Sequence, residues 1–154
     1  METEKLTKID IVKIHMVKDG TIDYGKRAIR NPKDLADLGM KFLKHADREM
    51  FVLVCLNSRN CINCIQLVSM GTVNTTIVSS RDVIKAVLIS NSVQMAFIHN
   101  HPSGDTDPSE DDLLLTRKLT ECGKLFDIKL LDHVIISDEG KYESFLERGL
   151  IKQT

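Results

Sequence analysis

The sequence contains no long hydrophobic run. No apolar stretch of the 154-residue chain approaches the roughly 18–20 uncharged residues that a membrane-spanning helix needs. The first ten residues, METEKLTKID, also lack the apolar segment of a secretory signal peptide. These absences argue against a membrane partner and predict a cytoplasmic protein.

The chain also has almost no net charge. Its 21 basic and 22 acidic side chains leave a formal charge of −1. Such a balance provides no overall field that would attract nucleic acid or an anionic membrane. A nucleic-acid partner is therefore not supported by net charge, although a local basic patch stays open as an alternative.

Cysteines are few, and they do not form the two pairs of a zinc finger. Of the four cysteines, Cys61 and Cys64 have the Cys-x-x-Cys spacing of half a zinc site or of a redox pair. No second pair follows, and this pair lies in a strand-like apolar stretch. Because an export signal is lacking, we interpret the cysteines as reduced, buried thiols.

Repeats and low-complexity linkers are absent, and predicted strands and helices alternate along the chain. Capping residues at Asn31, Ser79 and Ser109 precede side chains whose apolar spacing is typical of helices. Strand-like runs occupy residues 9–18, 51–56, 61–70, 93–98, 128–136 and 142–145. A chain of this length suits one domain with its own core. We therefore predict an α/β fold, with residues 1–154 forming a single domain whose mixed β-sheet is flanked by helices.

Side chains that could carry chemistry concentrate in residues 97–112, FIHNHPSGDTDPSEDD. His99 and His101 lie two residues apart at the end of a predicted strand, so their side chains point to the same side. After a Pro/Gly turn, Ser109 is expected to cap a helix in which Asp112 is the third residue. The Asp112 carboxylate then leans back toward the histidines. Two nitrogens and one oxygen suit Zn²⁺ and leave a fourth position for water.

The spacing leaves alternatives open at this point. A His-x-His pair alone is a weak signal, and Asp112 alone is more often a helix-capping acid. Other carboxylates in the stretch compete as oxygen donors, namely Asp105, Asp107, Glu110 and Asp111. A metal-bound water also needs a general base to accept its proton. Glu49 is the best-placed upstream acid for this role because burial beside an apolar strand can raise its pKa. The alternative for Glu49 is a surface acid at a helix-to-strand junction.

These residues resemble a known family. The pattern His-Asn-His-Pro-Ser-Gly, three residues, then Pro-Ser-x-x-Asp is similar to the signature of RadC-like proteins within the JAB/MPN (JAMM) metalloproteases. The similarity extends from about Glu49 to Leu150, and it implies a fold similar to that of cytidine deaminases. Longer members carry a helix-hairpin-helix region ahead of this domain, and no such region is visible here. The family's association with DNA repair is therefore a weak guide to this chain.

The resemblance also implies roles for individual residues. By similarity, His99, His101 and Asp112 are zinc ligands. Glu49 is the general acid and base, and Ser109 stabilises the oxyanion. The expected protein is a zinc-dependent metallopeptidase that hydrolyses a peptide, isopeptide or similar amide bond in a peptide or protein substrate.

Three other functions stay open. A non-catalytic JAB/MPN scaffold would keep the fold and bind a partner protein, and a DNA-repair protein or nuclease would act on DNA. A zinc deaminase needs His-x-Glu followed by Pro-Cys-x-x-Cys, whereas Cys61 and Cys64 precede the histidines and lack the proline. His133, on a late strand, could orient a metal ligand. The alternative is a histidine at a strand position whose hydrogen bonds are satisfied and which has no role at the metal.

Overall fold

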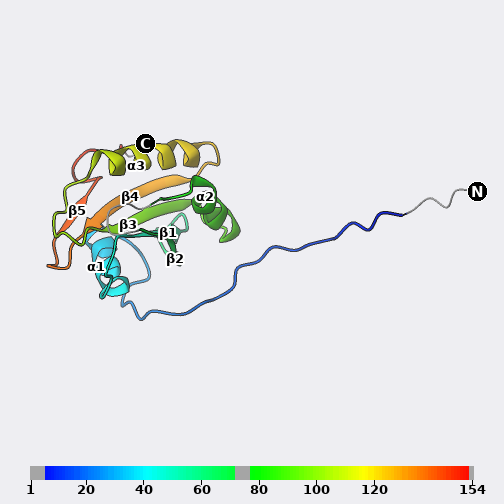
Figure 1. The fold of residues 1–154 in the computed structure, drawn as a ribbon, viewed down its shortest axis with the longest axis horizontal. Helices are drawn as coiled ribbons and strands as arrows, with labels where there is room; N and C mark the ends of the chain where they lie inside the picture. Colours follow the sequence, from blue (N-terminus) through cyan, green and yellow to red (C-terminus); the bar gives the residue numbers. More distant parts are fainter. Residues whose placement is uncertain (1–5, 72–76, 153–154) are drawn as a thin grey trace, which may run out of the picture.

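A five-stranded β-sheet forms the middle layer of the protein (Figure 1). The computed structural model describes residues 6–71 and 77–152. Along the chain, the helices and strands are α1 (Pro32–Phe42), β1 (Met50–Leu56), β2 (Ile62–Met70), α2 (Ser80–Ile89), β3 (Gln94–Asn100), α3 (Glu110–Lys124), β4 (Lys129–Ile136) and β5 (Tyr142–Ser144). Helices and strands therefore alternate as the sequence predicts.

The sheet is mixed, and its strand order is β2-β1-β3-β4-β5. Strands β3 and β4 are parallel, while β1 pairs antiparallel with both β2 and β3, and β5 pairs antiparallel with β4. All seven residues of β3 are buried, including the polar residues Gln94, His99 and Asn100. The predicted mixed α/β sheet is confirmed.

Helices cover both faces of the sheet. Helix α1 packs beneath β3 and β4, while α2 and α3 lie on the opposite face (Figure 1). Because side chains alternate along β3, Ile98 packs into the cluster under α1 and Phe97 into the cluster under α2 and α3. By the same alternation, His99 faces α3. The fold thus places the first predicted ligand, His99, on the face of β3 that lies toward α3.

Helices α1, α2 and α3 each begin where the sequence predicts. The side chain of Asn31 accepts a hydrogen bond from Asp34 N, and Ser79 and Ser109 cap α2 and α3 in the same way. No helix in the described part of the chain has both the length and the apolar character to cross a membrane.

The strand predicted at residues 9–18 is wrong. None of these residues is in a strand, and the segment runs extended away from the domain (Figure 1). Its side chains are exposed, with Ile9 at 86% and Ile11 at 99%. Alternating apolar residues supply only one half of a β-ladder, and among the described residues this segment has no strand beside it.

The expectation that the cysteines are reduced and buried holds in part. All four are free thiols, but only Cys55 is fully buried. Cys61, immediately before β2, and Cys64, near the start of β2, are half-buried.

Candidate metal centre

The two predicted histidines lie side by side at the end of β3. His99 is the penultimate residue of the strand and is 2% exposed. His101 follows the strand, and its backbone amide donates to the Ile136 carbonyl at 3.0 Å. The two imidazole rings meet edge to face, with centroids 4.8 Å apart. The prediction that they share one side is confirmed.

Asp112 reaches this pair from the first turn of α3. The Ser109 hydroxyl accepts from Asp112 N at 3.1 Å, and the Ser109 amide donates to Asp112 Oδ2 at 2.8 Å. This reciprocal capping turns the carboxylate back toward β3, as predicted. Asp112 Oδ1 lies 3.4 Å from His99 Nδ1, and Oδ2 lies 3.3 Å from His101 Nε2.

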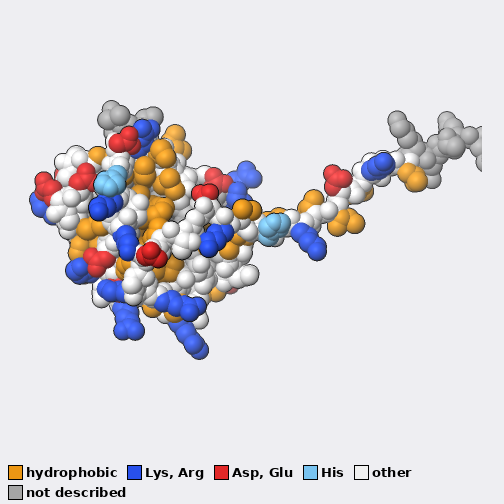
Figure 2. All heavy atoms as spheres, turned by 90° about the horizontal axis from the view of Figure 1, so that it is seen from below, with side chains coloured by type: hydrophobic (Ala, Val, Ile, Leu, Met, Phe, Trp, Pro, Cys, Tyr) orange, Lys and Arg blue, Asp and Glu red, His pale blue; other side chains and the backbone are white. Residues whose placement is uncertain are grey.

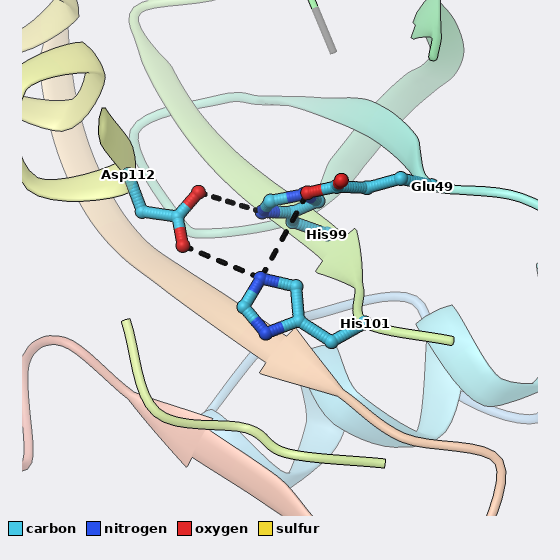
Figure 3. A group of neighbouring side chains, drawn as sticks. All are labelled: Glu49, His99, His101 and Asp112. Atoms are coloured by element: carbon cyan, nitrogen blue, oxygen red, sulfur yellow. Dashed lines mark hydrogen bonds and ion pairs between the residues drawn. The ribbon is translucent and has the colours of Figure 1, made fainter. Parts of the chain in front are cut away.

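Glu49 completes the group from the residue before β1. Its Oε1 forms a hydrogen bond with His99 Nε2 and lies 3.8 Å from His101 Nε2. One ligand atom from each of Glu49, His99, His101 and Asp112 falls within 4.8 Å of all the others (Figure 3). All four residues of this group, which could hold a metal ion, were therefore predicted as site residues from the sequence.

The competing carboxylates of the loop do not join this group among the described residues. Instead, they shape the loop. Asp107 Oδ1 accepts from Arg148 Nη1 at 3.0 Å, and Asp105 Oδ1 accepts from the Asp107 amide. The Asp105 carbonyl accepts from His101 Nδ1 at 2.7 Å. This bond places a proton on Nδ1, so Nε2, which faces Asp112 Oδ2 at 3.3 Å, is the ring atom that could bind a metal.

The charges in the group stabilise one another. Burial of the Asp112 carboxyl opposes its ionisation, but the hydrogen bond with His101 and the bonds from Ser109 outweigh burial and lower its pKa. The hydrogen bond from His99 lowers the pKa of Glu49 and outweighs the opposite effect of burial, so the expectation of a raised pKa is wrong. The hydrogen bond to Asp112 raises the pKa of His101.

The donor set fits a divalent cation. Two imidazoles and two carboxylates are ligands that zinc accepts. His99 Nδ1 is buried without a hydrogen-bond partner, although Asp112 Oδ1 lies 3.4 Å away. A buried nitrogen without a partner is costly, and shared coordination of an ion is one way to satisfy such a group.

His133 lies behind the group rather than in it. The side chain is completely buried, and its ring stacks on Phe145 with centroids 4.2 Å apart. Its Nδ1 lies 2.7 Å from Thr116 Oγ1, and the Thr116 hydroxyl donates to the Asp112 carbonyl at 2.7 Å. Because that donation uses the only hydroxyl proton, Nδ1–H of His133 is the donor to Thr116. His133 thus contacts the backbone of Asp112 through Thr116.

Sequence reasoning missed two residues that support the group. Thr116 lies one helical turn after Asp112, a spacing that could have indicated contact on the same helix face. Asn100 lies between the two histidines, and its amide bonds the backbone of Arg48 and Met50, on either side of Glu49. Its position inside the His-Asn-His string was the available signal.

Comparison with known proteins agrees with the fold. Residues 29–150 match the family described as RadC-like JAB domain. A UPF0758 protein of Methanosarcina barkeri is 39% identical over 131 residues, which cover 85% of this chain and 57% of the relative. A UPF0758 protein of Staphylococcus carnosus is 42% identical over 124 residues, which cover 80% and 54%. The chain therefore spans little more than half the length of these relatives.

Proposed function

The chain belongs to the RadC-like JAB domain family, and on that premise we propose that it is a zinc-dependent hydrolase of peptide, isopeptide or similar amide bonds. The observation that carries this proposal is the convergence of Glu49, His99, His101 and Asp112. These side chains come from the residue before β1, from the end of β3 with the residue after it, and from the first turn of α3. Three separate segments therefore meet at one point, which a helix cap or a strand pair alone does not require.

In this proposal His99, His101 and Asp112 hold the zinc ion. Bound zinc supplies a Lewis acid and lowers the pKa of water toward neutrality. The bond between His101 Nδ1 and the Asp105 carbonyl fixes the ring with Nε2 toward the group. The capping bond from the Ser109 amide fixes the Asp112 carboxylate. Both ligands are thus held by the protein before a metal binds.

Glu49 is the proposed acid and base. Its lowered pKa keeps the carboxylate ionised at neutral pH, which a proton acceptor requires. It lies beside both imidazoles and is half-buried, so it can take a proton from the attacking water and deliver that proton to the leaving amine.

Ser109 is the proposed donor to the oxyanion. Its oxygen accepts from Asp112 N, so its own hydroxyl proton remains free to donate. The residue is exposed at the start of α3, where a substrate carbonyl can approach it. A positioned donor of this kind stabilises the negative charge that develops on a carbonyl oxygen.

Metal content tests the ligand assignment. Elemental analysis is expected to find about one zinc per chain in the wild type and a large loss in His99→Ala, His101→Ala and Asp112→Ala. His45→Ala and Asp111→Ala remove exposed residues of the same types and should keep zinc. Near-stoichiometric zinc in all three of these variants would contradict the assignment of the three residues as zinc ligands.

Glu49→Gln separates a base from a fourth ligand. If Glu49 is the base, Glu49→Gln should retain zinc and lose turnover on a peptide or isopeptide substrate that the wild type cleaves. Zinc lost from Glu49→Gln would make it a ligand, and unchanged hydrolysis would exclude it as the base. A zinc-loaded wild type that cleaves none of a broad set of amide substrates would favour a scaffold instead.

A further inference from the structure

The N-terminal arm, residues 8–18, has the pattern of a strand, but no strand of the described residues pairs with it. Its sequence is KIDIVKIHMVK, and the segment extends away from the domain (Figure 1). Figure 2 shows hydrophobic atoms along the exposed length of the arm. The exposed apolar side chains are Ile9, Ile11, Val12, Ile14, Met16 and Val17, each more than half exposed. An exposed apolar segment of this length is unfavourable in water unless a partner covers it.

Strand β2 offers a free edge of matching length. It is the first strand of the sheet, and its nine residues, INCIQLVSM, include no charge and no proline. Charged side chains and proline are the usual protection of a sheet edge against pairing with another chain. Within residues 6–71 and 77–152, the outer edge of β2 pairs with other backbone only at its start, through the bridge between Ala28 and Cys61 and the bond from the Ile62 amide to the Arg27 carbonyl.

The apolar surface beside this edge is incomplete. Helix α1 packs against β3, β4 and β5. On the same face, Ile65 and Leu67 of β2 join the apolar cluster but remain half-buried. An added strand with apolar side chains on that face would cover them.

The chain's own arm is directed elsewhere. The Tyr24 hydroxyl donates to the Asp34 carbonyl at 2.7 Å, and Lys26 Nζ lies 2.5 Å from Asp34 Oδ1. These contacts anchor the segment after the arm at the start of α1, and the arm leaves the domain from there (Figure 1).

We propose that the arm of a second copy of this chain adds as a strand to the free edge of β2, and that two copies exchange arms. Val12, Ile14 and Met16 alternate, so they share one face of an extended strand and can cover Ile65 and Leu67. Nine residues of extended chain span about 30 Å in both partners. A reciprocal exchange about a twofold axis covers both arms and both edges. Neither the arm nor β2 contributes to the group around Glu49.

Light scattering after size exclusion measures the assembly, and hydrogen exchange measures the pairing. We expect a mass of twice the chain's 17.4 kDa, with amides of the arm and of β2 protected together. Ile14→Lys should halve the mass and expose the arm amides. This variant changes only an exposed side chain outside the domain, so its folding is not in question. Leu125→Lys adds the same charge at an exposed apolar position after α3 and should keep the dimer.

A charge pair tests the contact between the arm and β2. Leu67→Glu alone should also halve the mass. Mixing it with Ile14→Lys should restore the dimer, because one interface then pairs Lys with Glu and the other is wild type.

Several results would overturn the proposal. A monomer with unprotected arm amides excludes the exchange, and a monomer with protected arm amides means that each chain covers its own edge. A dimer that survives Ile14→Lys uses another interface. A mixture of the two charged variants that stays monomeric removes β2 as the docking site.

Discussion

Asn100 holds the backbone on both sides of Glu49. Its Oδ1 accepts from the Met50 amide at 2.6 Å, and its Nδ2 donates to the Arg48 carbonyl at 2.9 Å. Asn100 is 3% exposed, so water does not compete strongly for these bonds. The residue between the two candidate ligands therefore also places the candidate base.

Asn100→Ala is expected to lower kcat on an amide substrate about 100-fold while zinc content stays unchanged. Loss of both bonds frees the backbone that carries Glu49, and a shift of about 1 Å in a catalytic group costs a factor of that order. The ligands remain because His99 and His101 stay on β3. Steady-state kinetics and elemental analysis on the same preparations measure both effects.

A distant asparagine provides the matched control. Asn63 Nδ2 donates to Ser92 Oγ at 2.8 Å, away from the group, so Asn63→Ala should retain kcat. Wild-type kcat in Asn100→Ala would mean that the two backbone bonds do not place Glu49.

Ser109 has a capping role and a proposed catalytic role, and two substitutions separate them. Ser109→Ala should cost about 1 kcal/mol of unfolding free energy, because alanine cannot cap α3, whereas Ser109→Gly should cost only a few tenths. Both remove the hydroxyl, so both should lower kcat about 100-fold or more. Urea unfolding and kinetics on the two variants give the comparison.

Ser79, the cap of α2, is the control for Ser109. Ser79→Ala should lose similar stability and keep kcat. Full activity in Ser109→Gly would show that the hydroxyl contributes only to capping.

Most of the fold could be predicted because its signals are local. Asn31, Ser79 and Ser109 mark helix starts through bonds to residues three positions later. The buried strands are likewise visible as apolar runs. The pattern at residues 9–18 gave the wrong answer because a strand also needs a partner, and pairing is decided by residues distant in sequence.

The same difference between local and distant contacts explains which parts of the candidate site could be predicted. His99, His101 and Asp112 were predicted from strand alternation and helix capping, both local rules. The position of Glu49 relied on resemblance, and its pKa was predicted in the wrong direction because its contact with His99 is 50 residues away in the chain. Asn100 was missed for the same reason.

Gly39 allows α1 to lie close to the sheet. A Cβ added there would be 2.4 Å from Ile98 Cγ2 and 3.2 Å from Ile136 Cδ1. Alanine favours a helix over glycine by about 1 kcal/mol, but both isoleucines are buried and have little space to move. We expect steric overlap to dominate, so that Gly39→Ala lowers the unfolding free energy by about 1–3 kcal/mol.

A double-mutant cycle checks this explanation of Gly39. Chemical denaturation of Gly39→Ala, Ile98→Ala and the double variant gives the coupling free energy. Gly39→Ala should cost less when Ile98 is already alanine, and equal costs in both backgrounds would contradict the overlap.

We expect the buried His133 side chain to make the protein less stable in mild acid. Burial lowers the pKa of this histidine well below its ordinary value, so the folded state keeps the ring neutral while the unfolded chain takes up a proton near pH 6.5. The unfolded state then binds more protons, and stability falls as pH falls below about 6.5. Between about pH 7.5 and about pH 5.5 this linkage removes about 1.4 kcal/mol.

His133→Phe removes this proton and suits the aromatic neighbours Phe51 and Phe145. The variant loses the bond to Thr116, so its unfolding free energy at about pH 7.5 should be lower than that of the wild type by about 1 kcal/mol. Its further loss on acidification should be smaller than the wild-type loss by about 1.4 kcal/mol. Urea unfolding with a chelator present excludes metal release as a cause, and His45→Phe, which removes an exposed imidazole, should keep the wild-type loss. Parallel pH profiles for His133→Phe and the wild type would mean that another group accounts for the acid sensitivity.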